Sequence, residues 1–306
     1  MEHKTFLFFD CECANCFDGI GKICSLGYVL ADDELNVIES EDIVMNPETD
    51  FDWYLFSPKN KCQLAYSKDY FRSKPNFDFF YKRIKKLFTN GNCFISGFAV
   101  SNDVGFVNNA CERYYKEYIK FRAFDAEKLL SQKFDCKKKL FEWAEFLECD
   151  VSKLESHKSV DDAMVTMLVL KKLCEKENKT LEQFMKENKG FFVSSEQVQI
   201  QAQEREYKKE MMSKIKAYYT KRSPNPIRKN YIGQKFELNK KVFSDLERAL
   251  NIAKRIYEGG GVLLERLKEK GNIVFLDDDI EPERRLAIEK KGLRIILAEE
   301  IERIVQ

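Results

Sequence analysis

The chain has little of several features that mark other classes of protein. Its 306 residues include two histidines, two tryptophans and six prolines, and no apolar run approaches the roughly 18 residues needed to cross a bilayer. The apolar stretch Phe6 to Phe9 is too short for a signal-peptide core. Lys plus Arg number 52 and Asp plus Glu 51, so no excess of one charge indicates a histone-like or acidic-tail protein. We expect a cytoplasmic protein with no membrane partner, whose affinity for nucleic acid would come from local patches.

The ten cysteines all lie between Cys11 and Cys174. A disulfide framework is typical of much shorter secreted chains, so reduced and mostly buried thiols are expected. The cluster Cys11, Cys13, Cys16 and Cys24 suggests zinc, but it lacks the paired C-x(2–4)-C knuckles of structural zinc sites. A zinc or redox sensor is therefore a minor alternative, which would predict stoichiometric bound zinc.

Hydrophobic periodicity predicts an α/β fold in the first half of the chain. Strands are predicted first and a mixture of strands and helices after them. The predicted strands are residues 4–12, 20–30, 35–45 and 93–99, and the predicted helices are residues 77–88, 103–115, 126–130, 140–147 and 160–175. Thr180 and Gln183 form a capping-box pattern for one more helix, so the first domain is expected to span residues 1–190.

The second half contains a linker and a smaller domain. Residues 191–230 predict a helical linker with a basic second half, interpreted as a solvated spacer or as a patch that contacts phosphates. Residues 231–306 alternate short strands (235–238, 273–276 and 293–297) with helices (245–257 and 282–291). That alternation predicts a small parallel-sheet domain.

Asp10 and Glu12 stand two residues apart on a predicted buried strand. The two-residue period of a strand places both carboxylates on one face and Cys11 on the other. Two buried carboxylates repel each other unless a positive charge lies between them, and a hard divalent cation with oxygen ligands is the simplest candidate. The alternative is a strand end that reaches solvent.

Three further residues extend this candidate site. Asp103 follows a predicted strand, where it could also serve as a helix-capping acid. His157 lies in a polar loop, and Asp162 lies early in a strongly apolar helix whose packing would hold it near the sheet. A base of near-neutral pKa beside metal-binding acids is what activation of water at neutral pH requires.

The order of these motifs resembles the DEDDh exonucleases of the ribonuclease H-like superfamily, which include the proofreading subunit of bacterial DNA polymerase III. The motifs are Asp10-Cys11-Glu12, Asn102-Asp103 and His157-Lys-Ser-Val-Asp161-Asp162, and the resemblance covers residues 5–173. It implies a ribonuclease H-like mixed sheet flanked by helices.

The resemblance also implies a mechanism. Asp10, Glu12, Asp103 and Asp162 would hold two Mg²⁺ or Mn²⁺ ions about 3.5 to 4 Å apart, with Asp10 bridging them. His157 would take the proton of the attacking water, and 5′-mononucleotides would leave from the 3′ end. Asp161 is an alternative ligand to Asp162, but the five-residue step from His157 favours Asp162.

The sequence departs from the family pattern beside these ligands. Cys13 stands where the family commonly has Thr, with Ala14 and Asn15 after it, so Cys13 and Asn15 are predicted to contact the terminal nucleotide in this chain's own way. Asn102 stands where many members have Phe.

The C-terminal part, residues 231–305, resembles a BRCT domain in its opening Gly233-Gln-Lys-Phe236 strand and its Gly259-Gly260 turn, but it lacks the signature Trp of the last helix. The resemblance implies docking of a DNA end or of a replication or repair protein, and the alternative is a purely structural module.

We expect a 3′-to-5′ exonuclease acting on the free 3′ end of DNA, with single strands favoured, in replication proofreading or repair. RNA as substrate is a close variant, because no residue is identified that would read the 2′-hydroxyl. The alternative from another class is a non-catalytic docking scaffold.

Overall fold

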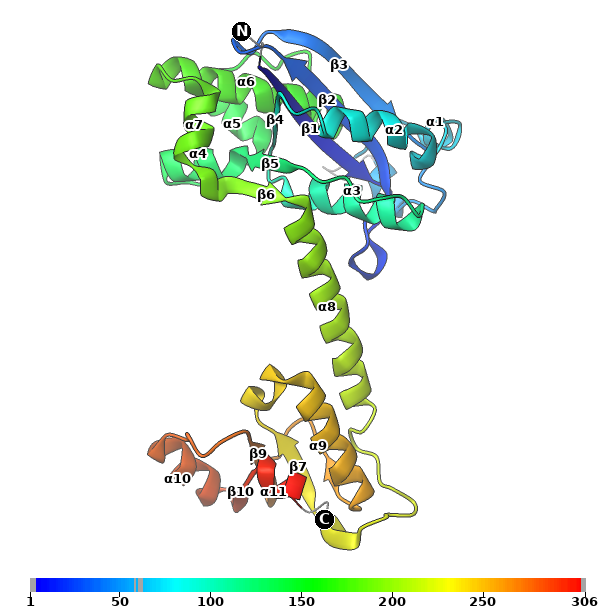
Figure 1. The fold of residues 1–306 in the computed structure, drawn as a ribbon, viewed down its shortest axis with the longest axis vertical. Coiled ribbons are helices and arrows are strands. Elements are labelled where there is room, and N and C mark those ends of the chain that lie inside the picture. The colour runs from blue at the N-terminus through cyan, green and yellow to red at the C-terminus, as the bar shows by residue number, and fades with distance from the viewer. Residues whose placement is uncertain (1–3, 58, 60–62, 304–306) are drawn as a thin grey trace. The chain divides into compact units, whose positions relative to one another are not determined.

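A six-stranded mixed sheet forms the centre of the N-terminal unit in this computed structural model (Figure 1), which describes residues 4–57, 59 and 63–303. The strand order is β3-β2-β1-β4-β5-β6. The strands are β1 (Thr5–Cys13), β2 (Ile23–Ala31), β3 (Val37–Val44), β4 (Cys93–Gly97), β5 (Arg122–Asp125) and β6 (Phe192–Ser194). The pairs β1–β4 and β4–β5 are parallel, and the other neighbours are antiparallel. This sheet confirms the predicted α/β fold class.

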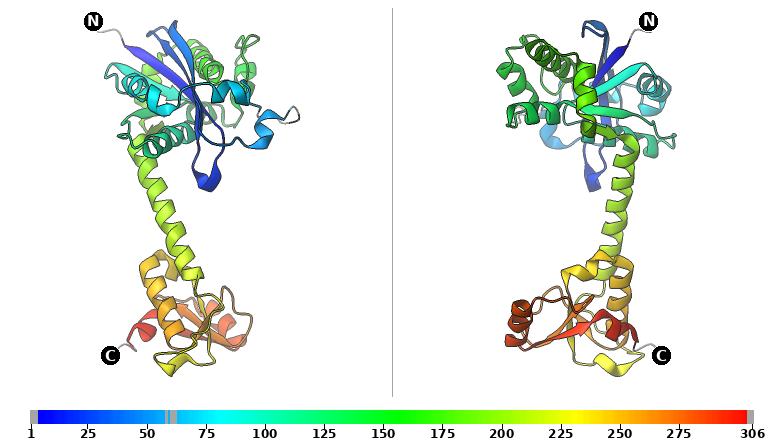
Figure 2. Two further views of the ribbon diagram at one scale, coloured as in Figure 1. Left: turned by 90° about the vertical axis from the view of Figure 1, so that its right-hand side faces the viewer. Right: turned by 60° about the vertical axis from the view of Figure 1, so that its left-hand side comes forward.

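Helices cover both faces of this sheet (Figure 2). They are α1 (Lys68–Arg72), α2 (Phe77–Phe88), α3 (Ser101–Arg113), α4 (Ala126–Phe134), α5 (Leu140–Phe146), α6 (Ser159–Glu177) and α7 (Leu181–Glu187). The core under α4 to α7 contains Phe6 and Phe8 of β1, whereas the core under α2 and α3 contains Leu7 and Phe9. The continuous apolar run of β1 is therefore that of a central strand buried on both faces.

A four-stranded sheet, parallel throughout, forms the second unit. Its order is β10-β9-β7-β8, and the strands are β7 (Lys235–Leu238), β8 (Val262–Leu263), β9 (Gly271–Phe275) and β10 (Leu293–Leu297). The helices are α9 (Leu246–Glu258), α10 (Pro282–Lys290) and α11 (Ala298–Arg303). The core that α9 and α11 share is separate from the one under α10, so helices pack on both faces here too. This sheet confirms the predicted parallel α/β class of the C-terminal part.

The chain divides into two compact units, Met1–Gln201 and Ala202–Gln306, and α8 (Ser195–Lys216) contains the boundary. Short 3₁₀ turns lie at Phe17–Gly19, Trp53–Phe56, Lys189–Phe191, Lys229–Tyr231 and Lys240–Ser244. The outer ends of the first and last predicted domains lie outside the described residues. In the described part of the chain, no helix combines the length and the apolar character that crossing a membrane needs.

Candidate active site

The end of β1 presents Asp10 and Glu12 on the face covered by α6. They follow Phe6 and Phe8 at the two-residue period of the strand, and Cys11 between them packs in the opposite core. The register pairs Asp10 with Gly27 of β2, and it shifts between Glu12 and Cys13. Both carboxylates are thus held on a rigid central strand just before it ends.

Gly27 allows α6 to approach this strand end closely. A Cβ atom on Gly27 would overlap the backbone of Ser159 and Val160, where α6 begins. The hydroxyls of Ser25 and Ser159 also form a buried hydrogen bond from β2 to the start of α6. The first turn of α6 therefore lies directly over the sheet beside β1, and Asp162 lies in that turn.

His157 joins α6 to β1 through two contacts. Its backbone N–H donates to Asp162 Oδ2 at 3.1 Å, and its Nδ1 lies 3.2 Å from Glu12 Oε1. The residue has a positive φ of 64°, a left-handed conformation that turns the loop into the helix. One ligand atom from each of Glu12, His157 and Asp162 lies within 4.8 Å of the others, the single such group found in the described ranges.

Asp103 reaches the same strand end from α3. Its Oδ1 accepts the backbone N–H of Cys11 at 3.2 Å, and the residue is 6% exposed. The turn between β4 and α3 lies close to β1, since a Cβ on Gly97 would be 2.9 Å from the Phe9 carbonyl oxygen. Ala99 in this turn has a positive φ of 52°. The structure thus brings the first turn of α3 against the end of β1.

Burial and neighbouring negative charges raise the pKa values of Asp10, Asp103 and Asp162. Burial raises the pKa of Asp10 well above its usual value, and neighbouring negative charges raise it further. Those neighbours are Asp103, Asp162, Glu12 and Asp42. Burial likewise raises the pKa of Asp103, and burial with the charge of Glu12 raises the pKa of Asp162 to about 7. The hydrogen bond to Glu12 raises the pKa of His157.

One oxygen of this cluster, Asp162 Oδ1, is buried and has no hydrogen-bond partner. A buried acceptor without a donor costs about 1 to 3 kcal/mol, so this atom favours a ligand. Clustered carboxylate oxygens are the donors that Mg²⁺ and Mn²⁺ prefer. The residues present therefore suit divalent cations.

The structure separates Asp161 from Asp162. Asp161 Oδ2 accepts the backbone N–H of Glu155 at 3.0 Å, and Lys158 Nζ lies 3.3 Å from the same carboxylate. Asp161 therefore holds the loop before α6, whereas Asp162 lies beside Glu12 and His157.

The two residues predicted to contact substrate lie just beyond β1. Cys13 Sγ is 3.4 Å from Cys16 Sγ. Asn15 is 1% exposed, and its amide donates to Thr49 Oγ1 at 3.3 Å and to the Asp50 carbonyl at 2.5 Å. Asn15 thus ties down the neighbouring loop, which favours an indirect role, and its contact with a nucleotide stays a prediction.

Among the described residues, no three cysteines bring their Sγ atoms within 4.8 Å of one another. The described cysteines are all free thiols, and all but the exposed Cys16 are at least partly buried. Cys62 lies outside the described residues. Cys11, Cys24 and Cys111 are buried and the others apart from Cys16 are intermediate in exposure, so burial of the described cysteines is less complete than predicted.

Two features near the site were not singled out from the sequence. Asp42 of β3 pairs with Gly27, so Asp10, Gly27 and Asp42 form one row across three strands. Trp53 is 79% exposed and lies in a loop beside the end of β1. The backbone N–H of Asp52 in this loop donates to the carbonyl of Ala14, which lies two residues after Glu12. The rarity of Trp was the available signal for the second feature, and no comparable signal marked Asp42 among the many acidic residues.

Known structures with similar folds include several exonucleases. A 3′-exonuclease described in specific recognition of the 3′ end of the histone mRNA stem-loop is 15% identical, with a TM-score of 0.48 over 57% of this chain and 65% of that chain. E. coli exonuclease I in complex with a dA16 oligonucleotide is 17% identical, with a TM-score of 0.48 over 57% of this chain and 42% of that chain. The matched part is less than two thirds of either of those chains.

A third structure is the nuclease domain of 3′hExo, described as a DEDDh family member bound to rAMP. It is 16% identical, with a TM-score of 0.48 over 57% of this chain and 92% of that domain. A comparison with curated protein sequences gives no match. Residues 7–170, more than half of the chain, match the sequence profile of the exonuclease family (RNase T type), and this protein therefore belongs to that family.

Proposed function

We propose that this protein is a metal-dependent 3′-to-5′ exonuclease that releases 5′-mononucleotides from single-stranded DNA. The observation that carries the proposal is the grouping of Glu12, His157 and Asp162 at the end of β1, with Asp162 Oδ1 buried and unpartnered. Asp10 and Asp103 lie at the same strand end. Membership of the exonuclease family supports the reaction class. The resemblance to proofreading exonucleases supports a role in replication proofreading or repair.

Asp10, Glu12, Asp103 and Asp162 would hold two Mg²⁺ or Mn²⁺ ions. When bound, these ions would supply charge stabilisation for the phosphate and would make a water molecule a better nucleophile. The chain's own contribution is the rigid placement of the four carboxylates by β1, α3 and α6. Burial and mutual repulsion together raise the pKa of Asp10, and the repulsion is relieved when positive charge lies among the carboxylates.

His157 would act as the general base. Its Nδ1 is hydrogen-bonded to the Glu12 carboxylate. In the neutral imidazole this contact places the ring proton on Nδ1 and leaves Nε2 as an acceptor. The same carboxylate raises the pKa of the imidazole, so Nε2 takes up a proton more readily than a free histidine does. The proton of the attacking water would therefore move to Nε2 of His157.

Exposed aromatic side chains near the end of β1 support a single-stranded substrate. Phe17 is 63% exposed, Trp53 is 79% exposed and Tyr54 is 41% exposed, and the rings of Trp53 and Tyr54 lie 6.1 Å apart. Unpaired bases stack on such rings, whereas the bases of a duplex are already stacked on each other.

The C-terminal unit is proposed to be BRCT-like, which its parallel sheet supports. Docking of a replication or repair protein on this unit stays a prediction. RNA is the alternative substrate and is one arm of the experiment below.

The proposal is tested by digesting matched 5′-labelled DNA and RNA oligonucleotides with Mg²⁺ or Mn²⁺, and with EDTA as the control. We expect stepwise shortening from the 3′ end that requires metal and is faster on DNA. Asp162→Asn should abolish it, because the variant loses a ligand charge at the centre of the cluster.

Asp161→Asn is the matched control, since it changes the same chemical group one residue away. It should keep nearly full activity, because the asparagine side-chain oxygen can still accept the Glu155 N–H that holds the loop, and this group lies outside the cluster. Faster shortening of RNA would reassign the substrate. Absence of shortening on both strands would sink the enzyme assignment and favour the docking scaffold.

A further inference from the structure

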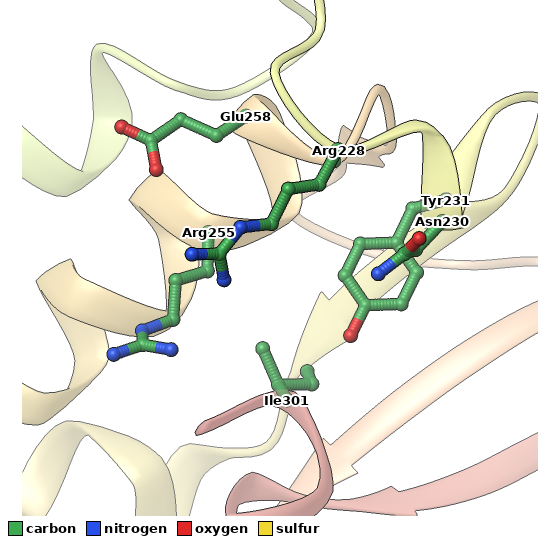
Figure 3. A pocket seen from close by; sticks show the side chains of 7 residues that line it. Arg228, Asn230, Tyr231, Arg255, Glu258 and Ile301 are labelled. Atoms are coloured by element: carbon green, nitrogen blue, oxygen red, sulfur yellow. The ribbon is translucent and has the colours of Figure 1, made fainter. Parts of the chain in front are cut away.

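A small pocket lies on the C-terminal unit, in a part of the chain that the proposed nuclease chemistry does not use (Figure 3). The loop before β7 contributes Arg228, Asn230 and Tyr231, and α11 contributes Ile301. The C-terminal end of α9 and the turn after it contribute Arg255, Glu258 and Gly259. Its inner space of about 20 Å³ admits one water-sized group.

The hydroxyl of Tyr231 is buried beside this space without a hydrogen-bond partner. Tyr231 is only 8% exposed, and its ring packs so closely that a Cβ atom on Gly259 would overlap it. In Figure 3 its hydroxyl points toward Ile301 and into the space enclosed by the labelled residues. A buried hydroxyl that lacks a partner is costly, so the pocket favours a group that accepts its hydrogen.

Two guanidinium groups give this pocket a positive lining. Arg255 donates to Asn251 Oδ1 at 3.1 Å and to the Glu302 carbonyl at 3.0 Å, so both of its acceptors are uncharged. Arg228 is an exposed residue of the loop that lines the pocket.

The one carboxylate of the lining, Glu258, is partly balanced by a lysine. Its Oε1 lies 3.7 Å from Lys254 Nζ, and in Figure 3 its carboxylate points away from Tyr231. The lining residues therefore favour an anion with several oxygen acceptors, because guanidinium donors match phosphate geometry. The charge of Glu300, near the Tyr231 hydroxyl, acts against an anion and is offset by Arg255 and Arg228.

We propose that a phosphate group of a nucleic-acid strand binds over the opening of this pocket, with one phosphate oxygen entering the inner space to accept the Tyr231 hydroxyl and the others facing Arg228 and Arg255. This inference rests on the proposed function, which makes nucleic acid the natural ligand of the chain. Lys221, Arg222 and Lys229 are exposed residues of the segment that leads into the pocket, and they could contact neighbouring phosphates of the same strand.

The test measures binding of a fluorescent DNA strand to the full chain in EDTA, where no cleavage can occur. We compare strands with and without a terminal phosphate and add inorganic phosphate as a competitor. The comparison shows whether the pocket recognises a terminal phosphate, a backbone phosphate or free phosphate. Tyr231→Phe should weaken strand binding roughly tenfold, the loss expected for one hydrogen bond to a charged group. Arg228→Ala should cause a similar loss. Arg294→Ala, which removes an exposed arginine of β10 outside the pocket, should change binding less than about twofold.

Thermal unfolding separates binding from folding. Tyr231→Phe removes a buried hydroxyl without a partner, so the variant should be at least as stable as the parent chain although it binds more weakly. Unchanged strand binding in both pocket variants would overturn the proposal. The proposal would also be overturned if the pocket variants lost binding to a phosphoserine peptide but bound the DNA strand as the parent chain does. Strand binding is measured without cleavage, so its result can be interpreted even if the protein proves not to be an exonuclease.

Discussion

The backbone of Val160 lies where a side chain on Gly27 would have to be. Gly27 pairs with Asp10 across β1 and β2, and the overlap would fall on the first residues of α6. The residue without a side chain is therefore what allows α6, with Asp162 in its first turn, to lie beside Asp10. The geometry of the candidate site depends on this contact between helix and strand.

Gly27→Ala should consequently disable the enzyme. The added methyl group would push the start of α6 from the sheet, at a cost of about 1 to 3 kcal/mol or more in the free energy of unfolding. A displacement of catalytic groups of about 1 Å can lower the rate roughly 100-fold, so activity should fall even where the variant folds. The measurements are urea unfolding and the exonuclease rate.

Gly105→Ala is the matched control for that substitution. Gly105 lies in α3, and a Cβ atom there would meet only Val198 Cγ1 at 3.8 Å, an ordinary contact. Alanine in a helix is favoured over glycine by roughly 0.4 to 1 kcal/mol, so this variant should be as stable or more stable. Equal effects of the two substitutions would contradict the role of Gly27.

The sequence predicts long elements with a clear hydrophobic period well. It predicts poorly which of these elements lie against each other in the folded chain. The apolar stripe of Phe77–Phe88 and the apolar run of β1 are strong local signals, and both elements are present. Five helices and strands were not predicted, α1, β5, β6, β8 and α11, because each has six residues or fewer, too few for a period to stand out. Gly27 lay inside a predicted strand, and no local pattern shows that the helix beginning at Ser159 passes over it.

The same contrast between local patterns and tertiary contacts applies to the positions of the site residues. Alternation along β1 was enough to place Asp10 and Glu12 on one face. The apolar stripe of α6 predicted only that Asp162 would lie near the sheet. The proximity of Asp103 and Asp162 to the end of β1 came from the family resemblance, since only tertiary structure joins these elements. Asp42 was missed because it lies on an edge strand rich in exposed acidic residues, where its burial is invisible in the sequence.

Divalent cations should stabilise the N-terminal unit by relieving repulsion among its carboxylates. A ligand present at 100 times its dissociation constant adds about 2.7 kcal/mol, and Mg²⁺ or Mn²⁺ should raise the melting temperature accordingly. Asp10→Asn should remove most of this shift, whereas Asp277→Asn, in the exposed acidic run of the other unit, should keep it. Both tryptophans, Trp53 and Trp143, belong to the N-terminal unit, so their fluorescence reports its melting. A shift that survives in Asp10→Asn would place the cations elsewhere.

His157→Asn should separate the role of a base from that of a metal ligand. Asparagine tolerates the left-handed backbone at this position better than most residues, so the loop before α6 should keep its path. Loss of a general base lowers kcat by about 10² to 10⁴, while the stabilisation by Mg²⁺ or Mn²⁺ should persist. If that stabilisation disappears together with the activity, His157 is a metal ligand, as its position beside Glu12 and Asp162 allows, and the base lies elsewhere.

Asp42→Asn should stabilise the protein at neutral pH. Burial raises the pKa of Asp42 to about 6, above the value of about 3.9 in an unfolded chain. The folded state therefore holds this proton more tightly, and the associated stability is present below about pH 4 and lost as the pH rises through 6. Asparagine carries no charge and can still accept the hydroxyl of Tyr66, which now donates to Asp42 Oδ2 at 3.0 Å.

The expected gain is on the order of 1 to 2 kcal/mol above pH 6, because each pKa unit corresponds to about 1.4 kcal/mol and partial solvent access reduces the effect. Unfolding by urea in EDTA, compared between the two proteins from pH 4 to 8, measures it. A gain of equal size at pH 4 and at pH 8 would contradict the assignment to ionisation of Asp42.

Trp53→Ala should weaken substrate binding and leave the chemistry intact. The side chain is 79% exposed, so its loss should not change the melting temperature measured from Trp143. Stacking of one base on an aromatic ring contributes about 1 to 3 kcal/mol, which predicts a rise in KM of roughly 5- to 150-fold with little change in kcat. Ile38→Ala is the control, because Ile38 is 57% exposed near the start of β3, about 13 Å along that strand from Asp42 and the site. A fall in kcat at saturating substrate would show that Trp53 positions the scissile phosphate, since a binding platform alone would alter only KM.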